Sequence, residues 1–277
     1  MNEQNPIGTT SSSHRQPRAF ARFVALGDSF TEGLSDPQPD HTNAYVGWAD
    51  RLAAHLARSA SEDGRRFGYA NLAVRGRLLD DIAGRQVDEA LALEPDLVSI
   101  VGGGNDILRP KADIDALAAK LEHAVGRLRA TGADVLLATP VDPRDAPLMK
   151  ATRGRAAIFT AHIWSIARRH DAHVIDQWGM AALRDWRLWA PDRIHMTPEG
   201  HRRVALNAFT TLGFTAEDAG WADPLPAAGP ISRTDAARAN AQWAREYVGP
   251  WVQRRLRGQS SGDAISPKRP TVTPFED

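Results

Sequence analysis

Residues 23–33 read FVALGDSFTEG, an apolar run that ends in Gly-Asp-Ser and passes into sequence compatible with a helix. A short, fully apolar run of this kind predicts a buried strand. Ser29 then lies at the carboxyl end of a sheet strand, which is where open α/β sheets bind their ligands. The stretch therefore predicts an α/β fold and marks Ser29 as a candidate nucleophile.

The chain up to residue 213 alternates between strand-like and helix-like segments. Strand-like runs cover residues 20–26, 67–74, 97–101, 135–138 and 173–175. Helix-like segments lie between and after them, at residues 45–58, 78–93, 114–129, 153–170 and 198–209. An alternation of this kind favours a parallel sheet with helices on both faces.

Charge and composition exclude several classes of function. The formal net charge of the 277 residues is zero, because 34 Lys and Arg balance 34 Asp and Glu, so we expect no nucleic-acid partner. The absence of cysteine excludes disulfides, thiol nucleophiles and thiolate metal sites. No stretch approaches the about 20 apolar residues of a membrane span, and the first residues lack the apolar core of a secretory signal. We expect a cytoplasmic protein without a membrane span, and its oligomeric state is not predicted.

Three regions are expected along the chain. Residues 1–18 are polar and read as a flexible N-terminal tail, and residues 19–213 form the α/β domain. Residues 214–277 form a C-terminal extension with a helix at about residues 233–248, and the composition of its end predicts poor order. The extension is expected to pack on the domain through Trp221, Trp243 and Trp251, with a lid near the site as the alternative.

Residues that could take part in catalysis follow four of the predicted strands. Ser29 comes after the first strand, Gly76 after the second, Asn105 after the third, and Asp192 and His195 after the fifth. The carboxyl ends of parallel strands meet at one edge of the sheet, so these residues can converge. A serine hydroxyl becomes a nucleophile when a neighbouring imidazole takes its proton, and a carboxylate can hold that imidazole in the required tautomer. Ser29, His195 and Asp192 fit these three roles.

Attack on a carbonyl also creates an oxyanion that requires hydrogen-bond donors. The backbone N–H groups of Ser29 and Gly76 and the side-chain amide of Asn105 are suitable donors. Gly76 lacks a Cβ, which lets a substrate approach the backbone closely. We interpret Asp28 and Asp106 as supporting residues that hold the backbone of the loops.

Taken together, the four segments resemble the sequence blocks of the SGNH hydrolases, also called the GDSL esterase/lipase superfamily. The resemblance covers roughly residues 22–212, and its blocks are Gly27-Asp28-Ser29, Gly76, Gly103-Gly104-Asn105-Asp106 and Asp192-Arg193-Ile194-His195. Thr31 stands where the nucleophile elbow of ordinary α/β-hydrolases has its second glycine, which favours the SGNH family over those enzymes.

This resemblance implies a three-layer α/β/α fold of flavodoxin-like type, with a central five-stranded parallel sheet and, here, a helical C-terminal extension. It implies a serine hydrolase that cleaves a carboxylic ester or thioester through an acyl-enzyme. The implied roles are nucleophile for Ser29, base for His195, orienting carboxylate for Asp192, and oxyanion donors for Ser29, Gly76 and Asn105. The implied substrate is a small-molecule acyl ester, and no metal or cofactor is implied.

The sequence is also compatible with other substrates and functions. The substrate could be an acetylated sugar or a small acylated metabolite, which would make the protein a deacetylase. The fold could also serve as a non-catalytic flavodoxin-like binding module, or as a scaffold whose extension binds a partner. Residues 34–43, 107–112 and 142–149 are expected to build the acyl and leaving-group pockets.

We expect four further side chains to be packing or surface groups. His201, on the helix after the Asp-His segment, is expected to be exposed. Trp178, Trp186 and Trp189 are expected to pack the long loop that leads to Asp192.

Overall fold

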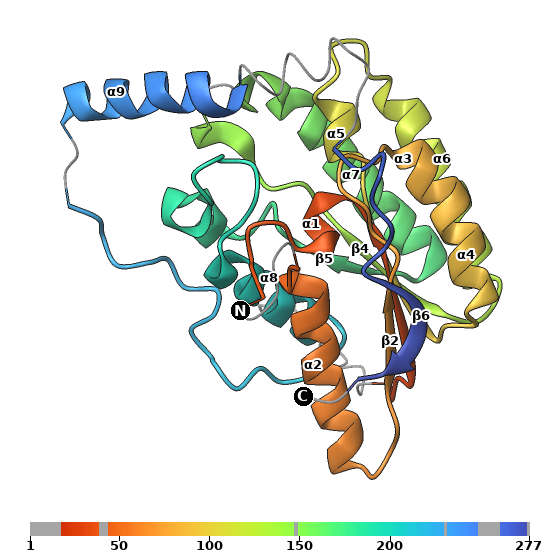
Figure 1. The fold of residues 1–277 in the computed structure, drawn as a ribbon. Coiled ribbons are helices and arrows are strands. Elements are labelled where there is room, and N and C mark those ends of the chain that lie inside the picture. The colour runs from red at the N-terminus through yellow and green to blue at the C-terminus, as the bar shows by residue number, and fades with distance from the viewer. Residues whose placement is uncertain (1–17, 39–43, 147–148, 230–231, 249–260, 276–277) are drawn as a thin grey trace, which may run out of the picture.

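The protein forms a six-stranded sheet with helices on both faces, in the strand order β5-β4-β3-β1-β2-β6 (Figure 1). The computed structural model describes residues 18–38, 44–146, 149–229, 232–248 and 261–275. The expected N-terminal tail therefore lies outside the described residues except for Arg18, and Trp251 lies outside them as well.

Five strands of the sheet are parallel, as the alternation of segments predicted. They are β1 (Arg22–Gly27), β2 (Gly68–Asn71), β3 (Leu97–Val101), β4 (Asp134–Ala138) and β5 (His173–Ile175). β1 lies between β2 and β3, and its last residue, Gly27, pairs with Val101. The carboxyl ends of β1 and β3 therefore lie side by side, which brings the residues that follow them to the same edge.

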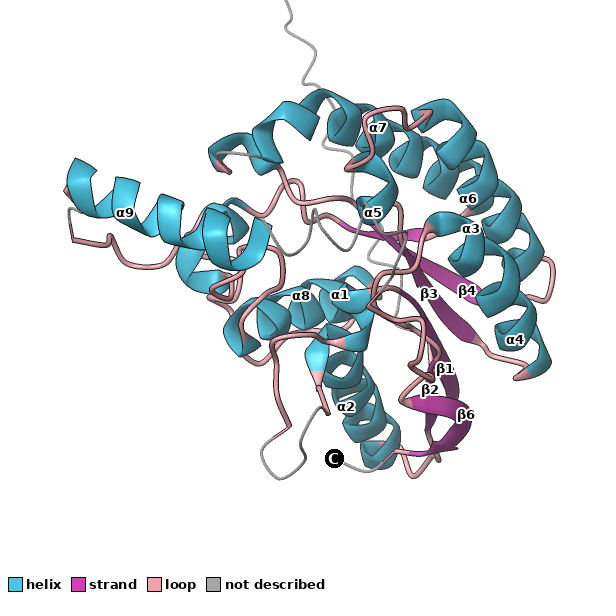
Figure 2. Ribbon diagram, turned by 45° about the horizontal axis from the view of Figure 1, so that its top comes forward, coloured by secondary structure: helices cyan, strands magenta, loops and turns pink. Residues whose placement is uncertain are grey.

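Helices cover the two faces of the sheet as two layers (Figure 2). α2 (Gly47–Glu62) and α8 (Pro198–Thr211) pack on one face. The other face carries α3 (Leu79–Asp81), a π-helical turn (Ile82–Gln86), α4 (Val87–Ala92), α6 (Ile114–Arg129) and α7 (Arg153–His170). The three-layer architecture is confirmed.

β1 shows why both faces need a cover. Phe23 and Ala25 belong to the hydrophobic cluster on the α2 side, whereas Val24 and Leu26 belong to the cluster on the α4 side. Successive side chains of a strand point to opposite faces, so an uninterrupted apolar run buries itself only between two layers. All four side chains are fully buried.

The sixth strand corrects the sequence-based expectation for the end of the chain. β6 (Arg269–Pro274) pairs antiparallel with β2 and makes the sheet mixed. The expected poor order is therefore wrong for these residues. Their polar and proline-rich composition hides a strand, because an edge strand needs only one partner and tolerates proline. Val272 faces the sheet where Gly68 leaves room for it.

Short helices complete the described chain. They are α1 (Ser29–Glu32), α5 (Gly104–Ile107) and four 3-10 turns at Pro143–Asp145, Met149–Thr152, Ala181–Arg184 and Trp186–Leu188. In the extension, α9 (Arg233–Trp243) continues into a π-helical turn (Ala244–Val248) and projects beside the sheet domain (Figure 1). None of the helices described here has the length and apolarity needed to cross a bilayer.

His201 is buried rather than exposed as expected. Its side chain lies between α8 and α2, where its Nδ1 accepts a hydrogen bond from the Trp48 backbone at 3.2 Å and its Nε2 donates to the Leu34 carbonyl at 3.1 Å. Burial lowers the pKa of His201 to about 4, against a partial opposing effect of the Leu34 hydrogen bond. The helical pattern places this residue on the inner face of α8, and its two backbone partners make burial of a neutral imidazole acceptable.

We expect His201 to make the fold sensitive to acid. In the unfolded chain the imidazole takes up a proton below about pH 6.5, whereas the folded chain keeps it neutral down to about pH 4. The unfolded state binds more protons in this window, so the free energy of unfolding falls as the pH drops through it, by about 3 kcal/mol from this group. Denaturant unfolding at several pH values, for the wild type and His201→Gln, measures this loss as a difference. A difference that does not change with pH would contradict a buried neutral His201.

Candidate active site

Ser29 begins a one-turn helix at the end of β1. Asp28 caps this helix, because its Oδ1 accepts a hydrogen bond from the Phe30 backbone at 3.1 Å, and Gly33 ends the helix in a left-handed conformation with φ of 97°. Gly27 has to be glycine, since an added Cβ would lie 2.4 Å from Thr31 Oγ1 and 2.8 Å from the Val101 carbonyl. The local sequence thus fixes where the strand stops and where the serine emerges.

A side chain of the π-helical turn also holds the end of β1. The fully buried Gln86 side chain accepts a hydrogen bond from the Gly27 N–H at 2.9 Å and donates one to the Gly27 carbonyl at 3.0 Å. One amide side chain therefore satisfies both backbone groups of the residue that lies two positions before Ser29. Unpaired buried backbone groups are costly, so this pairing stabilises the strand end.

Ser29, His195 and Asp192 form a continuous chain of hydrogen bonds. Ser29 Oγ lies 2.9 Å from His195 Nε2, and His195 Nδ1 lies 2.5 Å from Asp192 Oδ2. A carboxylate can only accept from the imidazole, so Nδ1 carries the proton and Nε2 is left to accept from the serine hydroxyl. The structure brings these three sequence-predicted residues together.

The conformation of the segment between Asp192 and His195 supports this chain. Asp192 Oδ1 accepts hydrogen bonds from the backbone N–H groups of Ile194 and His195, each at 3.0 Å. Arg193 adopts the left-handed region with φ of 56°, which turns the backbone sharply enough for those contacts. Burial raises the pKa of Asp192, but its hydrogen bond to His195, its electrostatic interaction with that ring and the two backbone bonds outweigh this and lower it. Asp192 is therefore ionised.

Asn105 lies beside the serine on α5. Its Nδ2 donates to Asp28 Oδ2 and to the Arg77 carbonyl, both at 3.1 Å. Gly103 makes the turn before it with φ of 93°, and a Cβ there would collide with the Phe159 ring at 2.8 Å. Both hydrogens of the Asn105 amide are thus engaged with the residues next to Ser29 and Gly76.

Gly76 occupies a turn after β2 and has φ of 74°. It does not belong to the described residues that line the cavity at Ser29, although its neighbour Arg77 binds Asn105. The turn is tied to the nucleophile helix by the buried Glu32, which accepts from the Arg75 backbone at 2.7 Å and from Arg75 Nε at 2.9 Å. Sequence reasoning missed this buried ion pair, because an acidic residue after Gly-Asp-Ser looks like an ordinary surface charge.

Asp28 and Asp106 each hold loop backbone. Burial raises the pKa of Asp28 to about 6, against the opposing effect of its bond from Phe30. Asp106 Oδ2 accepts a hydrogen bond from the Leu79 backbone at 3.0 Å, and burial raises its pKa as well. Both carboxyl groups therefore accept hydrogen bonds from loop backbone, and their supporting role in catalysis stays a prediction.

A cavity of about 250 Å³ opens beside Ser29 and His195. Its walls are largely apolar and include Phe30, Ile107, Leu108, Met149, Leu183 and Trp186. Residues 107–112 and 142–149 contribute to it as expected, whereas no described residue of 34–43 does. Trp186 and Trp189 line the cavity, so they do more than pack the loop, and Trp178 instead lies under the Arg153 guanidinium at 5.7 Å.

α9 contacts the Asp-His segment directly. Trp243 Nε1 donates to the Asp192 carbonyl at 2.7 Å, and Arg193 Nη1 donates to Asn240 Oδ1 at 2.6 Å. The Arg193 guanidinium lies 5.5 Å from the centre of the Trp186 ring and 5.1 Å from that of Trp243. The extension therefore reaches the main chain of Asp192. The sequence marks Trp243 as a packing residue, but no local pattern indicates that its partner is the Asp192 carbonyl.

The family model of the GDSL-like lipase/acylhydrolase family matches residues 25–203, from β1 into α8. The chain belongs to this family. The resemblance drawn from the four sequence blocks is confirmed, and the protein is an ester-hydrolysing enzyme. No curated protein matches the sequence.

Several solved structures have a fold similar to that of this chain. LAE5, an alpha/beta hydrolase from the metagenome of Lake Arreo, Spain, gives a TM-score of 0.60 at 23% identity, over 72% of this chain and 97% of its own. TesA gives 0.55 at 22% identity, over 69% and 97%. Axe2, an acetylxylan esterase from Geobacillus stearothermophilus, gives 0.58 at 19% identity, over 70% and 95%. At these identities the likeness shows a shared fold.

We expect Trp243 to matter for ester hydrolysis through the Asp192 main chain. Trp243→Phe removes one hydrogen bond and should lower kcat by about 3-fold, whereas Trp243→Ala also removes the ring over Arg193 and should lower it by about 10-fold. Trp164→Ala is the control, because Trp164 on α7 is 47% exposed and does not line the cavity. Steady-state hydrolysis of a p-nitrophenyl ester measures these effects. Equal rates for the Trp243 and Trp164 variants would contradict the expectation.

Proposed function

We propose that the protein is a serine esterase that works through an acyl-enzyme, with Ser29 as nucleophile, His195 as base and Asp192 as orienting carboxylate. The observation that carries the proposal is the hydrogen-bonded chain from Ser29 Oγ through both ring nitrogens of His195 to Asp192 Oδ2. Members of one family share a reaction class, so the ester-hydrolysing family of this chain supports the same proposal.

In the acylation step, Ser29 Oγ attacks the carbonyl carbon of the ester while its proton moves to His195 Nε2. The tetrahedral intermediate collapses, the bond from carbon to the leaving oxygen breaks, and the imidazolium returns the proton to that oxygen. Asp192 stays ionised and stabilises the imidazolium, consistent with the direction of its pKa. Water then gives a proton to Nε2 and attacks the acyl carbon. The bond from that carbon to Ser29 Oγ breaks, the imidazolium returns the proton to Oγ, and the acid leaves.

The oxyanion formed in each half-reaction requires donors. The N–H of Ser29 is a natural donor, because the first N–H groups of a helix have no intrahelical acceptor. We assign the other two donors to the Gly76 N–H and the Asn105 amide. Asn105 now donates to Asp28 and Arg77, so one of these bonds has to yield to the oxyanion when substrate binds.

The cavity favours an apolar acyl group in a small-molecule ester or thioester. Its lining near Ser29 is dominated by aliphatic and aromatic side chains, which stabilise methylene groups by removing them from water. Deacetylation of a sugar is the second candidate, because Axe2, an acetylxylan esterase, has a similar fold. An acetyl group would leave most of the apolar wall unused.

Removal of the nucleophile tests the reaction. We expect Ser29→Ala to lower kcat for p-nitrophenyl butyrate by at least about 10⁴-fold and to abolish labelling by a fluorophosphonate probe. Asn105→Ala should retain labelling and lower kcat by about 10²- to 10³-fold, the usual effect of losing one oxyanion donor. Circular dichroism and the thermal midpoint check that both variants fold. A folded Ser29→Ala enzyme with wild-type turnover would disprove the nucleophile assignment.

A series of acyl chains tests the substrate class. We expect kcat/KM for p-nitrophenyl esters to rise by about 4-fold per added methylene from acetate until the cavity is filled, because each buried methylene contributes about 0.8 kcal/mol. Acetylated xylooligosaccharides assayed beside the series are the comparison. Activity on the saccharides that exceeds activity on every longer p-nitrophenyl ester would favour the deacetylase instead.

A further inference from the structure

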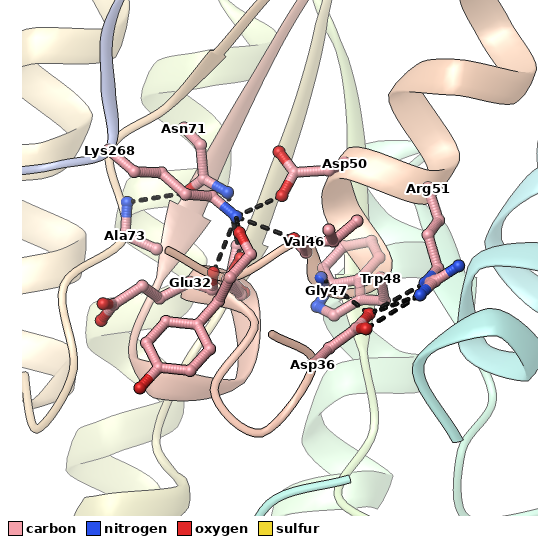
Figure 3. A network of polar contacts seen from close by, with 12 residues as sticks. Glu32, Asp36, Val46, Gly47, Trp48, Asp50, Arg51, Asn71, Ala73 and Lys268 are labelled. Carbon is pink, nitrogen blue, oxygen red and sulfur yellow. Dashed lines mark hydrogen bonds and ion pairs between the residues drawn. The ribbon is translucent and has the colours of Figure 1, made fainter. Parts of the chain in front are cut away.

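Residues 261–275 lie outside the span that the family model matches, yet they reach the helix that carries Ser29. Lys268 precedes β6 and is the contact (Figure 3). Its Nζ donates to the backbone carbonyls of Glu32 at 2.7 Å, Tyr45 at 2.9 Å and Val46 at 2.8 Å, and it also pairs with the Asp50 carboxylate. The ammonium group thus contacts four oxygens of the protein.

The three carbonyls belong to two segments that meet without side chains between them. α1 ends at Gly33 and α2 begins at Gly47, and a Cβ on Gly33 would lie 2.7 Å from the Gly47 Cα. Both glycines have positive φ, at 97° and 78°. Backbone meets backbone at this point, and the Lys268 ammonium binds both segments there. It does so beside the hydrogen bonds of His201 to Trp48 and Leu34 and the bond of Asp36 to Gly47, which join the same segments farther from the nucleophile turn.

The same contact extends to the turn that contains Gly76. α1 is one turn long, with Ser29 first and Glu32 last, so the carbonyl bound by Lys268 lies three residues from the nucleophile. The Glu32 carboxylate in turn holds the backbone and guanidinium of Arg75. Glu32 therefore connects Lys268, the start of the nucleophile helix and the Gly76 turn.

A second, steric contact joins residues 261–275 to that turn. A Cβ added to Gly262 would lie 2.1 Å from the Arg75 carbonyl, and Arg77 Nη2 donates to the Gly262 carbonyl at 3.2 Å. The backbone of Gly262 thus lies directly on the residues that flank Gly76. Residues 261–275 thus contact α1 through the charged Lys268 side chain and the Gly76 turn through the close packing of Gly262.

Protection of the sheet edge alone does not explain the contacts that Lys268 makes. β6 covers β2 by backbone pairing, and the neighbouring Arg269 lies over the rings of Tyr69 and Phe275 and donates to Thr273. Lys268 instead reaches the junction of α1 and α2, where it binds the carbonyls of Glu32, Tyr45 and Val46 (Figure 3). Arg269 is therefore a matched control for loss of a cation from the same segment.

We propose that Lys268 is a positioning residue for the nucleophile, and that residues 261–275 hold α1 and the Gly76 turn in the arrangement that catalysis requires. The proposal rests on the proposed function, since it needs Ser29 to be the nucleophile. Lys268 touches no reacting atom, and it acts through the Glu32 carbonyl and the backbone of residues 45 and 46.

The test compares Lys268→Met with Arg269→Met in p-nitrophenyl butyrate hydrolysis. Lys268→Met should lower kcat and the rate of fluorophosphonate labelling in parallel, by about 10- to 100-fold, with KM within about 2-fold of the wild type. Arg269→Met should leave kcat and KM unchanged. Gly262→Ala retains every charge, displaces the turn at Arg75, and should also lower kcat with little effect on KM.

Loss of Lys268 removes the cationic partner of the buried Asp50, so a second variant separates stability from positioning. Asp50→Asn with Lys268→Met removes both charges and should recover thermal stability while kcat stays low. A folded double variant with wild-type kcat and labelling rate would overturn the proposal. Ser29→Ala in the same assay separates the two hypotheses. The proposed function fails if this variant stays active or if the wild type cleaves no ester. An inactive Ser29→Ala variant beside a fully active Lys268→Met variant refutes only the positioning role.

Discussion

The contact between Ser29 Oγ and His195 Nε2 is the constraint on which the rest of the site depends. It joins side chains that are 166 positions apart over a distance of 2.9 Å. A hydrogen bond needs its donor and acceptor at about 2.7–3.2 Å and weakens steeply when its angle becomes unfavourable. The strand end, the nucleophile helix and the Asp-His segment therefore each have to be held in place. The parallel sheet achieves the coarse alignment, because the carboxyl ends of β1, β3 and their neighbours meet at one edge.

The fine alignment comes from buried polar side chains that bind backbone. Gln86 binds the backbone of Gly27, Glu32 the backbone of Arg75, and Asp28 the backbone of Phe30. Each of these side chains is buried, so each would be costly to leave without its partner. The requirement for satisfied partners makes the loops of the site as well defined as the strands. Lys268 and Trp243 extend the same principle to the C-terminal part of the chain.

Local patterns predicted the elements of the domain with good accuracy. The five parallel strands, the two helical layers and the family are confirmed. The helix expected at residues 78–93 contains a π-helical turn at Ile82–Gln86, which sets the Gln86 side chain on Gly27. No residue type marks such a turn in the sequence. The proposed roles of Ser29, Gly76, Asn105, Asp192 and His195 and the division at residue 213 remain predictions.

The sequence by itself determined the strand and helix order, the Gly-Asp-Ser strand end and the short Asp-to-His spacing, because these depend on apolar periodicity and on contacts within a few residues. The tertiary structure alone decided that residues 269–274 form a strand, that His201 is buried, and that Trp243 and Lys268 reach the site. The physical reason is the same in each case. An edge strand, a buried imidazole and a lysine among carbonyls are favourable only where distant segments supply the partners, and those partners exist only after the chain has folded.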